Sequence, residues 1–164
     1  MRYLKHVFIT VVLFACGACF CHSQEIKKVK IGELKTLIDT TNHPLIINFW
    51  ASWCQPCVHE IPWFEENVKP LKGKVELILV SLDFIEDYPT HIADFAKEHG
   101  FTSRIIFLNE TNADIFCPLI DSTWDGAVPA TLFVDKQRNY RRFYTEQITE
   151  PKFKMALNDM MNNN

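Results

Sequence analysis

The chain has 164 residues, 48% of them hydrophobic and 13% aromatic, and this length fits one compact domain with a short appendage better than two full domains. A charged fraction of 23% is too low for a disordered chain, and six Cys residues are too few for a small fold held together by disulfides. The formal net charge of −3 argues against nucleic acid as a general partner, because binding phosphates requires a surplus of Lys and Arg.

The first 23 residues have the three-part layout of a secretory signal. Arg2 and Lys5 precede a nearly unbroken apolar run over residues 7–15, and small residues follow it. The run is shorter than the roughly 20 residues of a membrane-spanning helix. We therefore expect residues 1–23 to be a signal peptide and residues 24–164 to be the folded domain of a protein exported to the bacterial periplasm or cell envelope.

Two kinds of cleavage are compatible with this leader. Residues 13–16 resemble a bacterial lipobox that would place a lipid on Cys16, although Phe14 is larger than the residue usual at its position, and Cys19 is a second candidate. Ordinary cleavage near Ser23 would instead remove all three early cysteines. A soluble or loosely anchored protein is the favoured interpretation, and a committed lipid anchor is the alternative.

After the leader, helix-like and strand-like segments alternate and are joined by short connections. In chain order, the hydrophobic pattern predicts a helix over 31–39, a strand over 45–50, helices over 57–68 and 89–99 on either side of a strand over 75–82, a strand over 104–108, a helix over 111–119, strands over 130–134 and 140–144, and a helix over 151–161. A polar turn joins the last two strands into a hairpin. This order predicts an α/β domain with a central mixed sheet flanked by helices.

Two cysteines, Cys54 and Cys57, stand where the buried strand over 45–50 gives way to a helix. At a helix N-terminus, unpaired backbone N–H groups and the helix dipole favour an anion, so the pKa of the Cys54 thiol should be lowered. A second thiol three residues later can close a disulfide and expel whatever the first has captured. We interpret Cys54 as the attacking thiol and Cys57 as the resolving thiol of a disulfide exchange.

Cysteines with this spacing also occur in zinc sites, and a reactive cysteine also occurs in peroxiredoxins. Half of a zinc site has the same spacing, and His59 is near enough in the sequence to be considered as a ligand. Zinc needs four ligands, however, and Cys117 and the scattered histidines form no second paired cluster, so we expect no metal and no other cofactor. A resemblance to peroxiredoxins would require Thr or Ser three residues before the reactive cysteine, where this chain has Ala51.

The motif resembles that of the exported TlpA/ResA/DsbE-like thiol-disulfide oxidoreductases, which have the thioredoxin fold. Residues 45–62 carry the strand, the Trp-Cys-x-Pro-Cys motif, an acid three residues after the second cysteine at Glu60, and a helix-kinking proline at Pro62. Further along, residues 126–131 match the loop whose proline, here Pro129, is cis in the family and faces the cysteine pair.

The resemblance covers roughly residues 31–160 and implies a thioredoxin-like fold with an extra strand-helix unit, about residues 89–108, inserted before the cis-Pro loop. It also implies a substrate-binding surface made by the motif and by the proline loop. The implied substrate-binding residues are Trp53, Gln55, Pro56, Val128 and Pro129. Trp124 either lines the same groove or packs inside the protein, and Cys117 is expected to be a buried, inert thiol.

Ordinary thioredoxins have a buried Asp in the strand before the motif, and this chain has Asn48 at the matching position. An Asn side chain cannot exchange a proton, so the resemblance implies that Glu60 takes over. Two interpretations of Glu60 stay open. It is either a partly buried carboxyl that accepts the Cys57 proton, with its pKa raised by desolvation, or an acid on the helix surface.

The function implied by the resemblance is reduction of disulfides in substrate proteins of the cell envelope, with a membrane-linked electron donor that keeps the dithiol reduced. Cytochrome c maturation and general envelope thiol repair are both compatible cellular roles. A metal- or heme-handling thiol protein, a redox-inactive binding module, and an oxidant or isomerase of the same fold are the alternatives.

Overall fold

A mixed sheet of six strands, in the order β1-β4-β3-β2-β5-β6, forms the centre of the computed structural model, which describes residues 25–162. The predicted signal peptide and lipid anchor lie outside these residues. Neighbouring strands run parallel from β1 to β2, and β5 and β6 join antiparallel. The strands are β1 (Lys27–Val29), β2 (Leu45–Trp50), β3 (Glu76–Ser81), β4 (Arg104–Leu108), β5 (Ala130–Asp135) and β6 (Tyr140–Tyr144).

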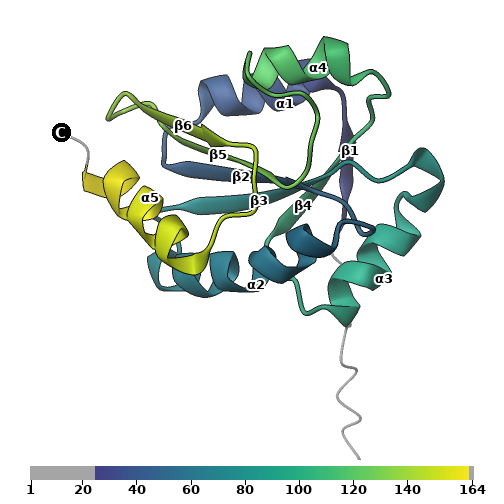
Figure 1. Ribbon diagram of the computed structural model, residues 1–164, viewed down its shortest axis with the longest axis horizontal. Coiled ribbons are helices and arrows are strands. Elements are labelled where there is room, and N and C mark those ends of the chain that lie inside the picture. The colour runs from purple at the N-terminus through teal and green to yellow at the C-terminus, as the bar shows by residue number, and fades with distance from the viewer. Residues whose placement is uncertain (1–24, 163–164) are drawn as a thin grey trace, which may run out of the picture.

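Helices cover both faces of the sheet (Figure 1). On one face lie α1 and α4, and on the other lie α2, α3 and α5. Their bounds are α1 (Ile31–Thr40), α2 (Gln55–Val68), α3 (Thr90–Glu98), α4 (Ala113–Ile120) and α5 (Glu150–Asn162), with short 3₁₀ helices η1 (Lys69–Leu71) and η2 (Ile85–Asp87). The protein therefore has three layers, with the sheet in the middle.

The central strand β2 is buried along its whole length because it contributes side chains to both layers. Ile46 and Trp50 belong to the apolar cluster beneath α2, α3 and α5, whereas Ile47 and Phe49 belong to the cluster beneath α1 and α4. This alternation is the period of two that a strand imposes on its side chains. It explains why the strand appears in the sequence as an apolar run that only Asn48 interrupts.

The thioredoxin-like α/β fold expected from the sequence is confirmed, and each predicted helix and strand is present with small differences at its ends. The expected extra unit is also present, as α3 and β4 between β3 and α4. Sequence reasoning did not find β1, which has only three residues, two of them exposed lysines. Within residues 25–162, the structure contains no helix with the length and apolarity needed to span a membrane.

Candidate active site

The two motif cysteines lie at the start of α2 and are joined by a disulfide in this structure. Cys54 is the N-cap residue of the helix, and its sulfur accepts a hydrogen bond of 3.3 Å from the backbone N–H of Cys57. Pro56 fits the first turn because its missing N–H would have no partner within the helix there. Cys54 keeps 5% of its surface exposed and Cys57 none, so an external sulfur can reach Cys54 first.

The proline loop meets the same end of the sheet. Ala130, the first residue of β5, pairs with Phe49 of the antiparallel strand β2. Pro129 therefore lies level with Trp50, the last residue of β2, from which the chain continues into the cysteine motif. The Val128–Pro129 peptide bond is cis, as the resemblance implied.

Glu60 is fully buried, so the interpretation of this residue as an acid on the helix surface is wrong. Its Oε1 accepts a 2.8 Å hydrogen bond from Nδ2 of Asn48, and its Oε2 accepts one of 2.8 Å from the backbone N–H of Ile148. Burial raises the pKa of the Glu60 carboxyl from 4.5 to about 7, and these two hydrogen bonds oppose the rise only in part. The carboxyl lies on the same helix as Cys57, three residues further on.

Asn48 connects Glu60 to the strand that follows the cis proline. Its Nδ2 donates a second hydrogen bond, of 3.0 Å, to Oγ1 of Thr131 in β5. Its Oδ1 is buried and has no hydrogen-bond partner among the residues that the structure describes. The cysteine helix and the proline strand are thus linked below the surface by one carboxamide.

Residues 18–143 match the AhpC/TSA family over most of the chain. The chain belongs to the AhpC/TSA family. Among its curated relatives, the chain is 25% identical to the thiol-disulfide oxidoreductase ResA of Geobacillus thermodenitrificans, over 77% of this chain and 68% of the relative. It is 30% identical to the thioredoxin-like protein YneN of Bacillus subtilis, over 48% of this chain and 46% of the relative. It therefore spans between about half and two thirds of the length of these curated relatives.

Solved structures agree on the fold of this AhpC/TSA family member. A thioredoxin-related protein from Neisseria meningitidis serogroup B superposes with a TM-score of 0.63 and 25% identity, covering 76% of this chain and 90% of that one. StoA from Bacillus subtilis gives a TM-score of 0.53 with 21% identity, over 73% and 86% of the two chains. The Cys54–Cys57 pair has the arrangement that thiol-disulfide exchange requires, and curated relatives of the chain are named as thiol-disulfide oxidoreductases.

Among the other predicted site residues of this AhpC/TSA member, Trp53, Gln55 and Pro56 are exposed beside the cysteines, and Val128 is half-buried. Trp124 is 3% exposed and does not line a groove. Its Nε1–H donates a 2.8 Å hydrogen bond to the Ala127 carbonyl, and its ring packs 4.5 Å from that of Phe49, measured between centroids. Trp124 therefore supports the proline loop from inside.

Cys117 is buried in α4, as expected. Burial, together with the negative charges of Asp125 and Asp114, raises the pKa of its thiol to about 11. The thiolate, which is the reactive form, is therefore scarce at neutral pH.

Sequence reasoning missed a buried polar anchor next to the motif. Asp83 lies just beyond the end of β3, and its Oδ1 accepts hydrogen bonds from the backbone N–H of Ser52 at 2.8 Å and from its hydroxyl at 2.6 Å. Its Oδ2 accepts a third, of 2.7 Å, from the Ser81 hydroxyl. The signal available in the sequence was an acid directly after a buried strand, at the sheet edge where the motif also begins.

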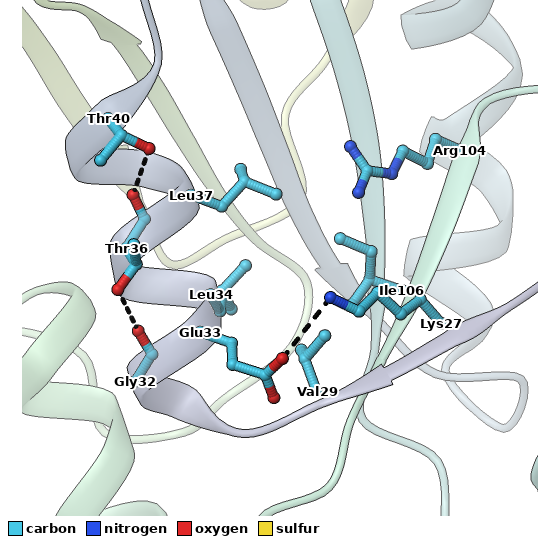
Figure 2. Close-up of a pocket in the computed structure, with 10 residues that line it drawn as sticks. All are labelled: Lys27, Val29, Gly32, Glu33, Leu34, Thr36, Leu37, Thr40, Arg104 and Ile106. Atoms are coloured by element: carbon cyan, nitrogen blue, oxygen red, sulfur yellow. Dashed lines mark hydrogen bonds and ion pairs between the residues drawn. The ribbon is translucent and has the colours of Figure 1, made fainter.

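No group of three or more His, Cys, Asp or Glu side chains that could hold a metal ion occurs in the described part of the chain. A hollow of about 420 Å³ lies between α1 and the neighbouring strands β1, at the sheet edge, and β4. Figure 2 shows Leu34 and Ile106 in this hollow and an ion pair between Lys27 and Glu33, 3.5 Å apart, beside them. None of its lining residues belongs to the cysteine site.

Proposed function

We propose that the protein reduces disulfide bonds of substrate proteins in the bacterial periplasm or cell envelope, through the dithiol of Cys54 and Cys57. The observation that carries this proposal is a cysteine pair at a helix N-terminus in which only the first cysteine keeps any exposed surface. The compartment rests on the signal-like pattern of residues 1–23, and the enzyme class rests on the relatives.

The exchange proceeds in two steps. The Cys54 thiolate attacks one sulfur of the substrate disulfide, which forms a mixed disulfide and releases the other substrate sulfur as a thiolate that takes up a proton. Cys57 then loses its proton and attacks the Cys54 sulfur, which releases the second substrate sulfur and forms the Cys54–Cys57 disulfide. Two electrons pass from the dithiol to the substrate, and a membrane-linked electron donor returns them to the pair.

The helix N-terminus favours the thiolate in the first step. The backbone N–H of Cys57 already points at the Cys54 sulfur, 3.3 Å away, and the positive end of the helix dipole lies at the same place. Both interactions are stronger with a negatively charged sulfur than with a neutral one. They therefore stabilise the thiolate of the attacking cysteine.

Glu60 serves the second step. Cys57 is fully buried, so solvent cannot take its proton directly. A carboxyl with a pKa of about 7 is present in both protonation states at neutral pH, which is the condition for accepting a proton and giving it up again in each cycle. We assign Glu60 as the proton acceptor for Cys57.

The proline loop and the motif bind the polypeptide that carries the disulfide. Val128 and Pro129 immediately precede β5, at the end of the sheet where the chain leaves β2 for the cysteine motif, and Trp53, Gln55 and Pro56 are exposed next to the cysteines in the sequence. An extended substrate can form backbone hydrogen bonds to such a loop. The Gln55-Pro56 pair between the cysteines resembles that of reducing family members, which supports reduction as the direction of exchange.

Capture of the mixed disulfide tests this function. In a Cys57→Ala variant the second step cannot occur, so envelope extracts should yield a substrate linked to Cys54 that dithiothreitol releases. Identification of the trapped proteins separates cytochrome c maturation from general thiol repair. Insulin reduction that survives in a Cys54→Ala variant would refute the mechanism, and a reduction potential as high as that of the strong periplasmic oxidants would refute the reducing direction.

A further inference from the structure

Three large apolar side chains are exposed on two loops at the cysteine end of the sheet. Trp53 is 56% exposed, Phe84 66% and Ile85 46%. Trp53 precedes Cys54 in the loop after β2, and the other two residues follow β3, the strand that pairs with β2. The remaining large apolar side chains with comparable exposure among residues 25–162 are Ile115, Leu119 and Met155.

Hydrogen bonds join the two loops to each other. The backbone N–H of Leu82 donates a 2.8 Å hydrogen bond to the Trp50 carbonyl, which extends the pairing of β2 and β3 by one step. Two residues after Trp50 in the first loop, both the N–H and the hydroxyl of Ser52 are bonded to Asp83, which is the residue after Leu82 in the second loop. Trp53 and Phe84 are the next residues, so each exposed ring follows one member of a buried hydrogen-bonded pair.

These hydrogen bonds hold the backbone next to the apolar side chains in one conformation. Ser52 is 8% exposed and Asp83 is 6% exposed, so the bonds that join the loops are shielded from competing water. A surface whose backbone is already ordered loses less conformational entropy on binding than a mobile loop does. Single exposed apolar residues are ordinary, but an ordered group of them beside a reactive sulfur indicates a contact surface.

Negative charge lies directly beside these side chains. Glu86 and Asp87 complete the 3₁₀ helix η2 that begins at Ile85. Neither carboxylate forms an ion pair with a side chain in the described part of the chain. Both are therefore available to a cationic group of a bound polypeptide.

We propose that Phe84 and Ile85 extend the substrate surface beyond Trp53 and select polypeptides in which an apolar side chain flanks the disulfide and a Lys or Arg lies beside it. The apolar side chain contacts Phe84 and Ile85, and the basic residue faces Glu86 and Asp87. This inference rests on the proposed function, since the substrate disulfide must reach Cys54. It names the substrate class that the cysteine motif alone leaves open.

Reduction of matched cystine peptides by the reduced protein tests the proposal. Three peptides differ only beside the disulfide, with Leu and Lys, with Ser and Lys, or with Leu and Glu. Contact with one apolar side chain should make the Leu-Lys peptide about tenfold faster in kcat/KM than the Ser-Lys peptide. The Leu-Glu peptide should also be slower than the Leu-Lys peptide, and added salt should reduce that difference because it screens exposed charges.

Variants locate the preference on the surface. In the Phe84→Ser/Ile85→Ser variant, the ratio of the Leu-Lys to the Ser-Lys rate should fall close to one. The matched control Ile115→Ser/Leu119→Ser removes two exposed apolar side chains from α4 and should keep the ratio of the wild type. Because the ratio is measured within each variant, a general loss of active protein does not change it.

Ellman's reagent separates the possible failures, since it is a small disulfide without flanking residues. If the wild type reduces Ellman's reagent but does not distinguish the peptides, the surface proposal is overturned and the proposed function stands. If the wild type reduces neither Ellman's reagent nor any peptide, both are overturned. A preference that persists unchanged in the Phe84→Ser/Ile85→Ser variant also overturns the surface proposal.

Discussion

Replacing Glu60 by Gln should stabilise the oxidised protein at alkaline pH. The side chain is fully buried, and Gln keeps its size while removing the ionisable group. In the wild type, burial raises the pKa of this carboxyl to about 7. At pH 8 the folded wild type must therefore hold a buried negative charge, which the variant does not have.

The size of the effect follows from the pKa. The pKa of the carboxyl is about 7 in the folded protein and 4.5 in the unfolded chain. The free energy of protonation therefore differs between the two states by roughly 3 kcal/mol, since each tenfold change in proton affinity is about 1.4 kcal/mol. The pKa is higher in the folded protein than in the unfolded chain. The protonated carboxyl therefore contributes its full stabilisation below pH 4.5, and this stabilisation is lost as the pH rises through 7. The variant lacks this loss.

Urea unfolding of the oxidised wild type and of Glu60→Gln at intervals between pH 4.5 and 8.5 measures the difference. The variant's free energy of unfolding relative to the wild type should rise by roughly 3 kcal/mol across this range, with most of the change between pH 5 and 7. Glu66→Gln, at an exposed acid on the same helix, controls for the loss of one negative charge. A difference between wild type and Glu60→Gln that stays constant with pH would refute the assignment of a titrating buried carboxyl.

Three further substitutions or labelling experiments test the surroundings of the site. Thr131→Val should lower the free energy of unfolding by about 1–3 kcal/mol, because it leaves a buried N–H of Asn48 without an acceptor; an unchanged urea midpoint would count against that hydrogen bond. Trp124→Phe removes the bond to the Ala127 carbonyl while keeping an aromatic ring, so we expect a loss of about 1 kcal/mol in the same assay, and a wild-type value would contradict a supporting role. In the reduced, folded protein, Cys117 should resist iodoacetamide at pH 8 until urea unfolds the chain, as followed by mass spectrometry, and rapid labelling would contradict its burial.

The elements that could be predicted from the sequence are those with strong local patterns. Residues 45–50 are almost all apolar, which predicts a strand buried on both faces. The loop around Pro129 resembles that of a known family, and this resemblance predicted the cis bond before Pro129. The strand β1 could not be predicted, because its place in the sheet depends on pairing with β4 and not on its own polar residues. The second cis bond, between Tyr88 and Pro89, had no motif to indicate it.

The candidate site divides in the same way. The position of Cys54 at a helix N-terminus follows from a strand that ends and a helix that begins within a few residues. The burial of Glu60 does not, because it depends on Ile148, which lies 88 residues away in the sequence, and on how α5 packs against α2. Helical spacing alone allowed both a buried and an exposed acid there, and only the tertiary fold decides between them.

The network around Glu60 also explains how an Asn can replace the Asp of ordinary thioredoxins. In this structure Nδ2 of Asn48 donates one hydrogen bond to Glu60 and one to Thr131. This arrangement suits an ionised carboxylate, because a carboxylate only accepts hydrogen bonds. When Glu60 carries a proton, half a turn of the carboxamide presents Oδ1 instead, which can accept from the carboxyl and from the threonine hydroxyl. In the first orientation Oδ1 lacks a partner, as it does here, and in the second the two hydrogens of Nδ2 lose the partners that they have here. Glu60 can therefore change its protonation without displacing the backbone of β2 or β5, which is what a proton acceptor for a buried thiol requires.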